Sequence, residues 1–210
     1  MCYNKPERKR KKNMIILFGL AGSGKGTQGR ALAEIFGWRW LSVGEAIRQT
    51  NEYDDIINQG NMIPDEDVIR LMGKQINKAE DEGFDIILDG YPRDAVQAQW
   101  LLDNMPERLD GAIILEVPKE ELLERLTLRG RDDDKERASI ERRFAIYEEN
   151  INAILPLLEV ANIPVKRVNG VGKVEEVTAR LVEVAKELNP DATEQVQDVN
   201  GGEIEHSYGE

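Results

Sequence analysis

Residues 14–27 read MIILFGLAGSGKGT, and this stretch decides the fold. Its first five residues are all apolar, which is typical of a strand buried on both faces. The pattern Gly19-x-x-x-x-Gly24-Lys25 follows, and it is the P-loop arrangement for holding phosphates. Glycines let successive backbone N–H groups face phosphate oxygens, the next helix adds its positive N-terminal end, and Lys25 supplies a compact cation. The stretch therefore predicts a strand–loop–helix unit that binds a nucleotide.

Short apolar runs alternate with helical patterns through the rest of the chain. We expect four further strands, each followed by one or more helices, at residues 39–43, 85–88, 111–117 and 164–168. Strands this apolar, alternating with helices, indicate a parallel sheet covered on both faces. The expected fold class is α/β: a P-loop three-layer sandwich with a five-stranded parallel sheet.

Composition narrows the kinds of chemistry that the chain can carry out. Cys2 is the only cysteine and His206 the only histidine. A disulfide framework, a Cys/His zinc site and histidine acid–base chemistry in the core are therefore excluded. The net charge of −12 argues against general nucleic-acid binding. The longest apolar runs fall well short of the roughly 20 residues of a membrane span, and the basic opening lacks an apolar core, so we expect a cytoplasmic protein.

The two ends differ in composition from the middle of the chain. Residues 1–13 carry six basic residues against one acid, which fits a solvated tail, or alternatively an arm that binds nucleic acid or a partner. Residues 189–210 carry six acids and no Lys or Arg, and such a segment is expected to be disordered. We therefore predict one folded domain over residues 14–188.

The end of the P-loop resembles that of a known family. GKGTQ, residues 24–28, is similar to the P-loop ending of adenylate kinases and related nucleoside monophosphate kinases. Gly26 follows Lys25 where many other P-loop proteins have Ser or Thr. The resemblance implies that Thr27 lies near the phosphates and the metal. It implies an ATP site that includes Gly22, Ser23, Gly24, Lys25, Gly26 and Thr27.

Two segments resemble the family's acceptor site. LSVGEAIR, residues 41–48, is similar to its S-T-G-D-x-L-R segment, which makes Arg48 the acceptor-phosphate arginine; a guanidinium fork binds two phosphate oxygens at once. Val43 stands in place of a threonine and Glu45 in place of an aspartate. GNMIPD, residues 60–65, resembles the segment that lines the acceptor base and ribose, although a break before an Asp-capped helix explains it equally well. The implied acceptor residues here are Ser42, Val43, Arg48, Met62 and Ile63.

The stretch LDGYPRDAVQA, residues 88–98, combines several functional residues. A strand ends at Asp89, whose carboxylate can hold magnesium through water. Arg93 follows at the carboxyl edge of the sheet, where doubly wound folds bind ligands. The family's DG[FY]PR motif has the same residues, with Gly90 at the acceptor and Arg93 on the acceptor phosphate. Gln97 matches a glutamine that binds the adenine of AMP, and its amide offers both a donor and an acceptor.

Arginines gather in ERLTLRGR, residues 124–131, and IERRFAIY, residues 140–147. The resemblance places Arg125 and Arg129 beside ATP, and Arg131 and Arg143 as arginines that close over the phosphates. Ion pairs along a solvated helix are the other explanation, and Arg142 fits that better. The lid, residues 129–139, is too short for an inserted zinc-binding domain, so we expect no structural zinc. Gly172 and Lys173 match a turn that holds the ATP adenine, although an ordinary strand–helix turn fits as well.

The resemblance spans residues 14–188, with a helical acceptor part at 42–72. It implies transfer of a phosphate from ATP to AMP with Mg²⁺, giving two ADP. The implied partners are ATP, AMP and ADP, with no nucleic acid and no membrane, and we expect a monomer. The catalytic residues would be Lys25, Asp89, Arg93, Arg129, Arg131 and Arg143. Two alternatives stay open: a kinase for UMP, CMP or another monophosphate, and an ATP-binding switch that transfers no phosphate.

Overall fold

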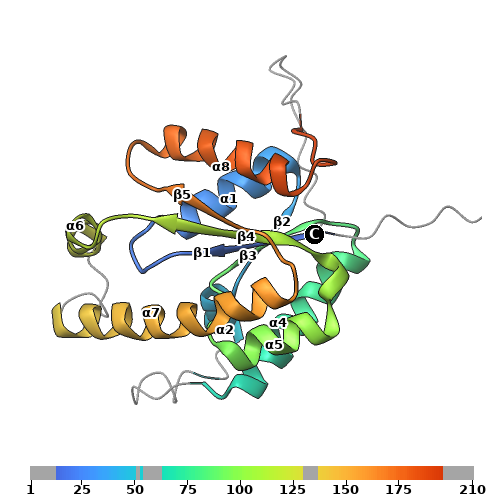
Figure 1. Cartoon of the computed structure of the whole chain (residues 1–210), viewed down its shortest axis with the longest axis horizontal. Helices are drawn as coiled ribbons and strands as arrows, with labels where there is room; N and C mark the ends of the chain where they lie inside the picture. The colour runs from blue at the N-terminus through green and yellow to red at the C-terminus, as the bar shows by residue number, and fades with distance from the viewer. Residues whose placement is uncertain (1–12, 51–52, 54–62, 130–136, 196–210) are drawn as a thin grey trace, which may run out of the picture.

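The sheet is the centre of the molecule (Figure 1). The computed structural model describes residues 13–50, 53, 63–129 and 137–195. Its five strands are β1 (Met14–Phe18), β2 (Arg39–Ser42), β3 (Ile86–Asp89), β4 (Leu109–Glu116) and β5 (Val165–Asn169). They form one sheet in the order β2-β3-β1-β4-β5, and every neighbouring pair is parallel. The predicted five-stranded parallel sheet is confirmed.

Helices cover both faces of the sheet (Figure 1). On one face lie α1 (Lys25–Phe36) and α8 (Val174–Leu188), and on the other lie α2 (Val43–Thr50), α4 (Asp65–Asp81), α5 (Ala95–Asn104) and α7 (Arg137–Val160). A short 3₁₀ turn, η1 (Pro106–Arg108), precedes β4. Helix α6 (Lys119–Arg129) follows β4 and lies beyond the carboxyl end of that strand. The three layers predicted from the alternating pattern are therefore present.

Strand β1 shows why its residues must all be apolar. Side chains alternate between the faces of a strand, so Met14 and Ile16 pack into the core cluster on one face, and Ile15 and Leu17 into the cluster on the other. All four are at most 1% exposed. Two apolar cores press on β1 from opposite sides, and they hold its carboxyl end in a fixed place.

The topology brings three connecting segments together at one edge. Leu17 of β1 and Ser42 of β2 both pair in register with Asp89, the last residue of β3. The P-loop follows β1, α2 follows β2, and the turn carrying Arg93 follows β3. These segments meet at the carboxyl ends of the strands, where open α/β sheets bind ligands.

The carboxyl end of the chain differs from the prediction over residues 189–195. Asn189 is only 2% exposed, and Ala192 packs against the core cluster shared by α1 and α8. The backbone N–H of Gln195 donates to the Ile35 carbonyl at 2.7 Å. Apolar contact and a main-chain bond thus hold this acidic segment on the domain, past the predicted boundary at residue 189. Within the described ranges, no helix is long and apolar enough to cross a membrane.

Candidate active site

A cavity of about 510 Å³ lies at the carboxyl ends of β1, β2 and β3. Most of its lining residues come from the segments singled out in the sequence. Its walls are Ala21, Gly22, Gly24, Lys25, Gly26, Thr27, Arg30, Trp40, Ser42, Gly44, Arg48, Asp89, Gly90, Arg93, Arg125 and Arg143. The structure therefore places the predicted donor and acceptor segments around one space.

The P-loop has the backbone form that its glycines permit. Gly22 and Gly24 have φ of 85° and 94°, which side chains with a Cβ rarely adopt. Helix α1 starts directly afterwards, with no side-chain cap and no acid in its first turn, so its positive end is left for an anion. The Lys25 ammonium donates to the Leu20 carbonyl at 3.1 Å, which keeps the cation at the loop.

Asp89 is a buried carboxylate, only 7% exposed, facing this loop. Burial raises its pKa, and the nearby Lys25 and Arg93 cations lower it by less. The Trp40 indole N–H also lowers the pKa, although it lies near the carboxylate without reaching hydrogen-bond geometry. The negative charge of Asp89 is therefore incompletely compensated by its neighbours, which suits a group that faces a cation.

Arg48 of α2 and Arg93 of the β3–α5 turn converge on Gly44. A Cβ at Gly44 would lie 3.4 Å from Nη1 of Arg48 and 3.8 Å from Nη2 of Arg93. Arg93 is further held by donation from its Nε to the Gly90 carbonyl at 3.2 Å. The Arg93 side chain faces the open cavity, yet burial of its guanidinium lowers its pKa. The negative charge of Asp89 raises that pKa in part, and the positive charge of Arg48 lowers it further. Two guanidinium groups held this close form a site for a multiply charged anion.

Arg125 and Arg143 reach the cavity from α6 and α7. Arg125 donates to the Gly170 carbonyl at 3.2 Å and, at the long distance of 3.5 Å, to the Ser23 carbonyl. It also pairs with Glu121 one turn earlier on its helix, at 2.5 Å. Arg125 thus connects the P-loop to the turn between β5 and α8, the two segments predicted to hold ATP.

Several predicted site residues do not line the cavity. Ser23 is 2% exposed and packs beneath the loop, where a Cβ on Gly19 would meet its Oγ at 2.6 Å. Val43 is fully buried in the core, and Ile63 packs against the same cluster. Gln97 is buried and bonded to other protein groups.

The remaining predicted residues fall into two groups. Lys173 is the N-cap residue of α8, its backbone N–H donates to Glu176, and Gly172 directly precedes it. Met62 and Arg131 lie outside the described residues, as does the side chain of Arg129. The part of the lid prediction that rests on them stays a prediction.

The sequence motifs did not identify Arg30 and Trp40 as residues that line the cavity. The Arg30 guanidinium lies over the Trp40 ring, 4.1 Å from its centroid, and pairs with Glu45 of α2 at 3.1 Å. Arg30 follows Thr27 by three residues on α1, so helical spacing puts both on one face. Trp40 precedes Ser42 by two residues on β2, so both share one face of that strand. Periodicity, rather than any motif, was the signal that could have identified them.

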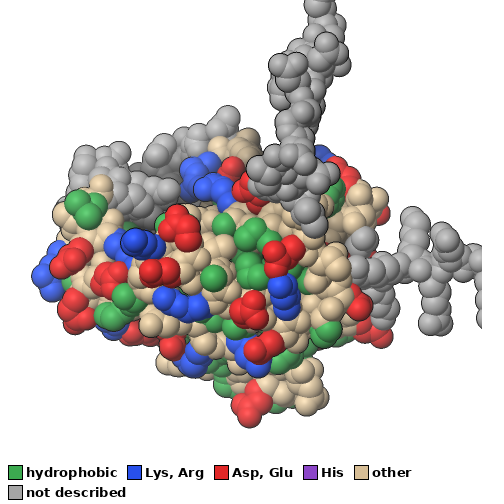
Figure 2. Space-filling view, turned by 90° about the horizontal axis from the view of Figure 1, so that it is seen from above, with side chains coloured by type: hydrophobic (Ala, Val, Ile, Leu, Met, Phe, Trp, Pro, Cys, Tyr) green, Lys and Arg blue, Asp and Glu red, His purple; other side chains and the backbone are tan. Residues whose placement is uncertain are grey.

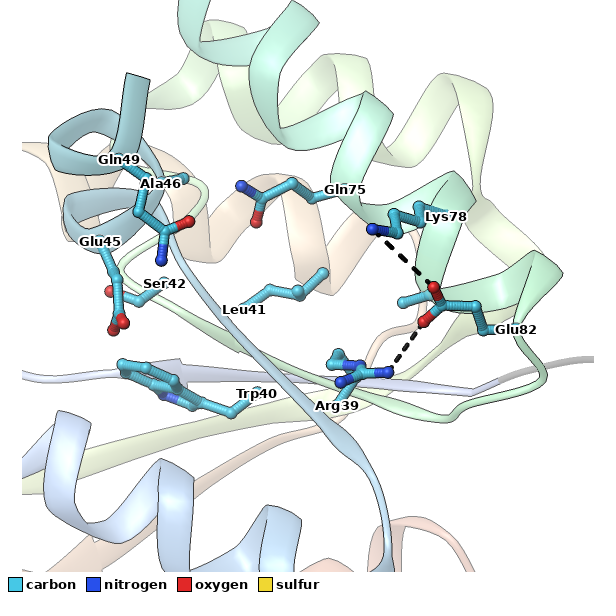
Figure 3. A pocket seen from close by; sticks show the side chains of 11 residues that line it. Arg39, Trp40, Leu41, Ser42, Glu45, Ala46, Gln49, Gln75, Lys78 and Glu82 are labelled. Atoms are coloured by element: carbon cyan, nitrogen blue, oxygen red, sulfur yellow. Dashed lines mark hydrogen bonds and ion pairs between the residues drawn. The ribbon is translucent and has the colours of Figure 1, made fainter. Parts of the chain in front are cut away.

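A second cavity, of about 420 Å³, lies outside the β2 edge between α2 and α4 (Figure 3). At one end of it Glu82 pairs with Arg39 at 2.8 Å and with Lys78 at 3.9 Å. Trp40 and Ser42 line both cavities. Among the described residues that were predicted for the site, only Ser42 lines this second cavity.

Charge is mixed over the face formed by α1 and α8. Figure 2 shows acidic and basic side chains interspersed there, with apolar side chains between them. On that visible face, the described residues form no broad basic surface of the kind that nucleic-acid backbones require. The clustering of arginines is a property of the cavity rather than of this surface.

Comparison with known proteins matches this geometry to one family. A family model described as adenylate kinase matches residues 17–163. The chain belongs to the adenylate kinase family. An adenylate kinase of Thermus thermophilus is 32% identical, over 80% of this chain and 94% of that protein. One from Mycolicibacterium vanbaalenii is 36% identical, over 79% and 95%, and one from Prochlorococcus marinus is 38% identical, over 70% and 84%.

Family membership confirms the resemblance seen in the motifs. The chain is a nucleoside monophosphate kinase of the adenylate kinase family, a family that uses Mg-ATP. Its substrates are accordingly nucleotides.

Proposed function

We propose that this enzyme transfers the γ-phosphate of ATP to AMP and releases two ADP. The observation that carries the proposal is the convergence of two sets of phosphate-binding groups on one cavity. Lys25 and the P-loop glycines line it together with Arg48 and Arg93. A nucleotide switch needs only the first set, whereas a phosphotransferase between nucleotides needs both.

The roles of the residues follow from the charge that develops during transfer. Negative charge spreads over the migrating phosphoryl group, so catalysis depends on positioning and on electrostatic stabilisation. Lys25 would follow that charge from the donor side, and Arg48 and Arg93 would hold the acceptor phosphate. Arg143 would add a further cation from α7. The acceptor phosphate oxygen is already ionised, so no general base is required.

The cavity also fits a magnesium ion carried by ATP. Asp89 and Thr27 both line it and would hold the ion through water. Among the residues described, no group of three or more His, Cys, Asp or Glu forms a metal cage. Mg²⁺ usually retains waters and binds one or two carboxylates together with substrate phosphates, so this arrangement suits it. The ion would bridge phosphate oxygens and neutralise part of their charge.

The choice of AMP as the acceptor rests on two supports. The relatives reported above are themselves named adenylate kinases. Gln97 also stands at the motif position of an adenine-binding glutamine, although in this structure its side chain lies outside the cavity lining. Val43, which stands in place of the family's threonine, is fully buried in the core and does not line the cavity.

A coupled assay for ADP formation tests the proposal. Mg-ATP is supplied with AMP, UMP, CMP, GMP or dTMP, and a Lys25→Met variant is the control. We expect activity with AMP that is abolished in the variant. Preference for another monophosphate would retain the chemistry but refute AMP as the acceptor. No product from any acceptor, despite ATP binding, would favour the nucleotide switch instead.

A further inference from the structure

The turn between β5 and α8, residues 170–173, is exposed at Gly172, yet its backbone is held by side chains. Arg180 donates to the carbonyls of Asn169 and Val171, at 2.5 and 2.9 Å. The N–H of Val171 in turn donates to Oδ1 of Asn169 at 2.9 Å. Among the hydrogen bonds within the described part of the chain, none uses the backbone N–H or carbonyl of Gly172. The turn therefore offers a ligand one donor and one acceptor on a restrained backbone.

Gln28 connects the helix that follows this turn to the helix that follows the P-loop. It lies on α1, directly after Thr27 of the cavity wall, and is only 3% exposed. Its Nε2 donates to the carbonyl of Val174, the first residue of α8, at 3.0 Å. Its Oε1 accepts from the hydroxyl of Thr178, about one turn further along α8, at 2.8 Å. A single buried amide thus bonds to two positions on the last helix of the domain.

These partners fix the orientation of the amide and the register of the two helices. A carbonyl can only accept, so Nε2 must face Val174, and Oε1 is left for the Thr178 hydroxyl. The surrounding contact is apolar, with Leu32 of α1 and Val177 of α8 in one core cluster. Apolar packing has no direction of its own, whereas a buried amide loses its hydrogen bonds if either helix slides. Gln28 therefore sets the position of α8 along α1.

A second connection joins the same two segments at the cavity. Arg125 lines the cavity and donates to the carbonyl of Gly170 in the turn and, at 3.5 Å, to that of Ser23 in the P-loop. The P-loop directly precedes α1 and the turn directly precedes α8, so a shift of α8 along α1 would move the turn relative to the P-loop. Gln28 and Arg125 together fix the distance from the P-loop to the unbonded backbone groups of Gly172.

We propose that Gln28 and Thr178 are positioning residues that hold the turn at residues 170–173 at the distance from the P-loop that ATP requires. The P-loop would bind the phosphates, and the N–H and carbonyl of Gly172 would meet the edge of the base. Gln28 and Thr178 act through the placement of α8 and do not touch the nucleotide themselves. A restrained turn strengthens binding, because less has to be ordered when the ligand arrives. The proposal deepens the function proposed above and rests on it, since it takes ATP as the donor.

Substitutions can remove the link between the helices while each helix stays intact. In Gln28→Met the side chain keeps its length, and the Thr178 hydroxyl can donate to the Val174 carbonyl, 2.8 Å away. Both groups on α8 then remain bonded, so this variant should fold. Thr178→Val removes only one of the two bonds, and Thr178→Ser keeps the hydroxyl. Thr127→Val is the matched control, because the exposed Thr127 hydroxyl donates to the Leu123 carbonyl four residues earlier on α6, also at 2.8 Å.

Isothermal titration calorimetry without an acceptor separates base binding from phosphate binding. The probes are Mg-ATP and Mg-tripolyphosphate, which lacks the base and the ribose. We expect Gln28→Met to weaken ATP binding by about 10-fold, and to change tripolyphosphate binding by less than about 2-fold. Thr178→Val should weaken ATP binding by about 3-fold, because one of the two bonds remains. Thr178→Ser should retain most of the affinity, and Thr127→Val should match the wild type.

Steady-state kinetics should agree with the binding measurements. In Gln28→Met the KM for ATP should rise by about 10-fold, whereas the KM for AMP should not change. Equal weakening of ATP and tripolyphosphate would assign Gln28 to the P-loop alone and overturn the proposal.

Two further outcomes would also overturn the proposal. One is unchanged ATP affinity in Gln28→Met, which together with a lower melting temperature would leave the link a purely structural role. The other is a wild type that binds ATP no more tightly than tripolyphosphate, because the turn would then contribute nothing to nucleotide binding. If the wild type made no ADP from any monophosphate, the proposed function would fail, and the calorimetric comparison alone would decide whether the link positions the turn.

Discussion

Replacing Gly29 with alanine should destabilise the protein, although the same change usually strengthens a helix. Gly29 lies on α1 against the Trp40 indole. A Cβ there would sit 2.6 Å from Nε1 and 2.7 Å from Cδ1 of Trp40, closer than the 3.0 Å that real Cβ atoms keep. The ring has little room to retreat, because the Arg30 guanidinium lies 4.1 Å from its centroid. Position 29 is therefore glycine because Trp40 occupies the space of a side chain.

Two opposing magnitudes decide the sign of this substitution. Alanine in place of a helical glycine gains about 1 kcal/mol. Forcing extra atoms into a packed site costs about 1–3 kcal/mol. We therefore expect Gly29→Ala to lower the free energy of unfolding by up to about 2 kcal/mol. With Trp40→Leu as background the clash disappears, and the same alanine should raise that free energy by about 1 kcal/mol.

Urea unfolding followed by far-UV circular dichroism measures all four members of this double-mutant cycle. Gly73→Ala is the matched control, because Gly73 is also a helical glycine beside a tryptophan. Its Cβ would lie 3.1 Å from Cη2 of Trp100, so a small shift accommodates it and we expect little net change. Stabilisation by Gly29→Ala alone, or effects that add within about 0.5 kcal/mol across the cycle, would refute the reasoning.

Three further substitutions test the cavity. Arg93→Ala should lower kcat/KM by about 100- to 1,000-fold with little change in melting temperature, and a mild effect would contradict its assigned role. Asp89→Asn should abolish Mg-dependent activity yet raise the melting temperature at pH 7. Burial raises the pKa of Asp89, so the ionised carboxylate destabilises the folded protein, and this destabilisation disappears as pH falls toward 3.8. The difference in melting temperature between Asp89→Asn and the wild type should therefore disappear at that pH. Arg125→Met should raise the KM for ATP more than that for AMP, because the Ser23 and Gly170 carbonyls lose their shared donor; equal changes would argue against a donor-side role.

The elements that the sequence predicted well depend on local patterns. The all-apolar run of β1 needs two cores to bury it, which already implies a covered parallel sheet. The P-loop likewise follows from glycines at positive φ before a helix. Asp89, Arg48 and Arg93 were placed in one cavity because parallel strands bring their carboxyl ends to one edge.

The features that were missed depend on contacts between distant segments. The environment of Gln97 is set by Asp65, which is 32 residues away along the chain. Trp40 enters the cavity wall only because Gly29, on another element, has no side chain. Composition alone indicated a tail from residue 189 onward, whereas the backbone N–H of Gln195 donates to the Ile35 carbonyl across the fold. Sequence patterns within one segment do not predict contacts between segments that are far apart along the chain.

The electrostatics of the cavity explain why its charges require so much support. Burial disfavours the charge of both Asp89 and Arg93, and each only partly relieves the other. Arg48 adds repulsion instead of relief. A site prepared for phosphoryl transfer must hold such charges before the substrate arrives, because reorienting them during the reaction would cost part of the barrier reduction. The fold meets that requirement with neutral restraints, the Gly90 carbonyl and the Gln97 amide on Arg93, which fix the cation without neutralising it. Its charge therefore stays available to a phosphate, and nucleotide binding should in turn stabilise the folded protein.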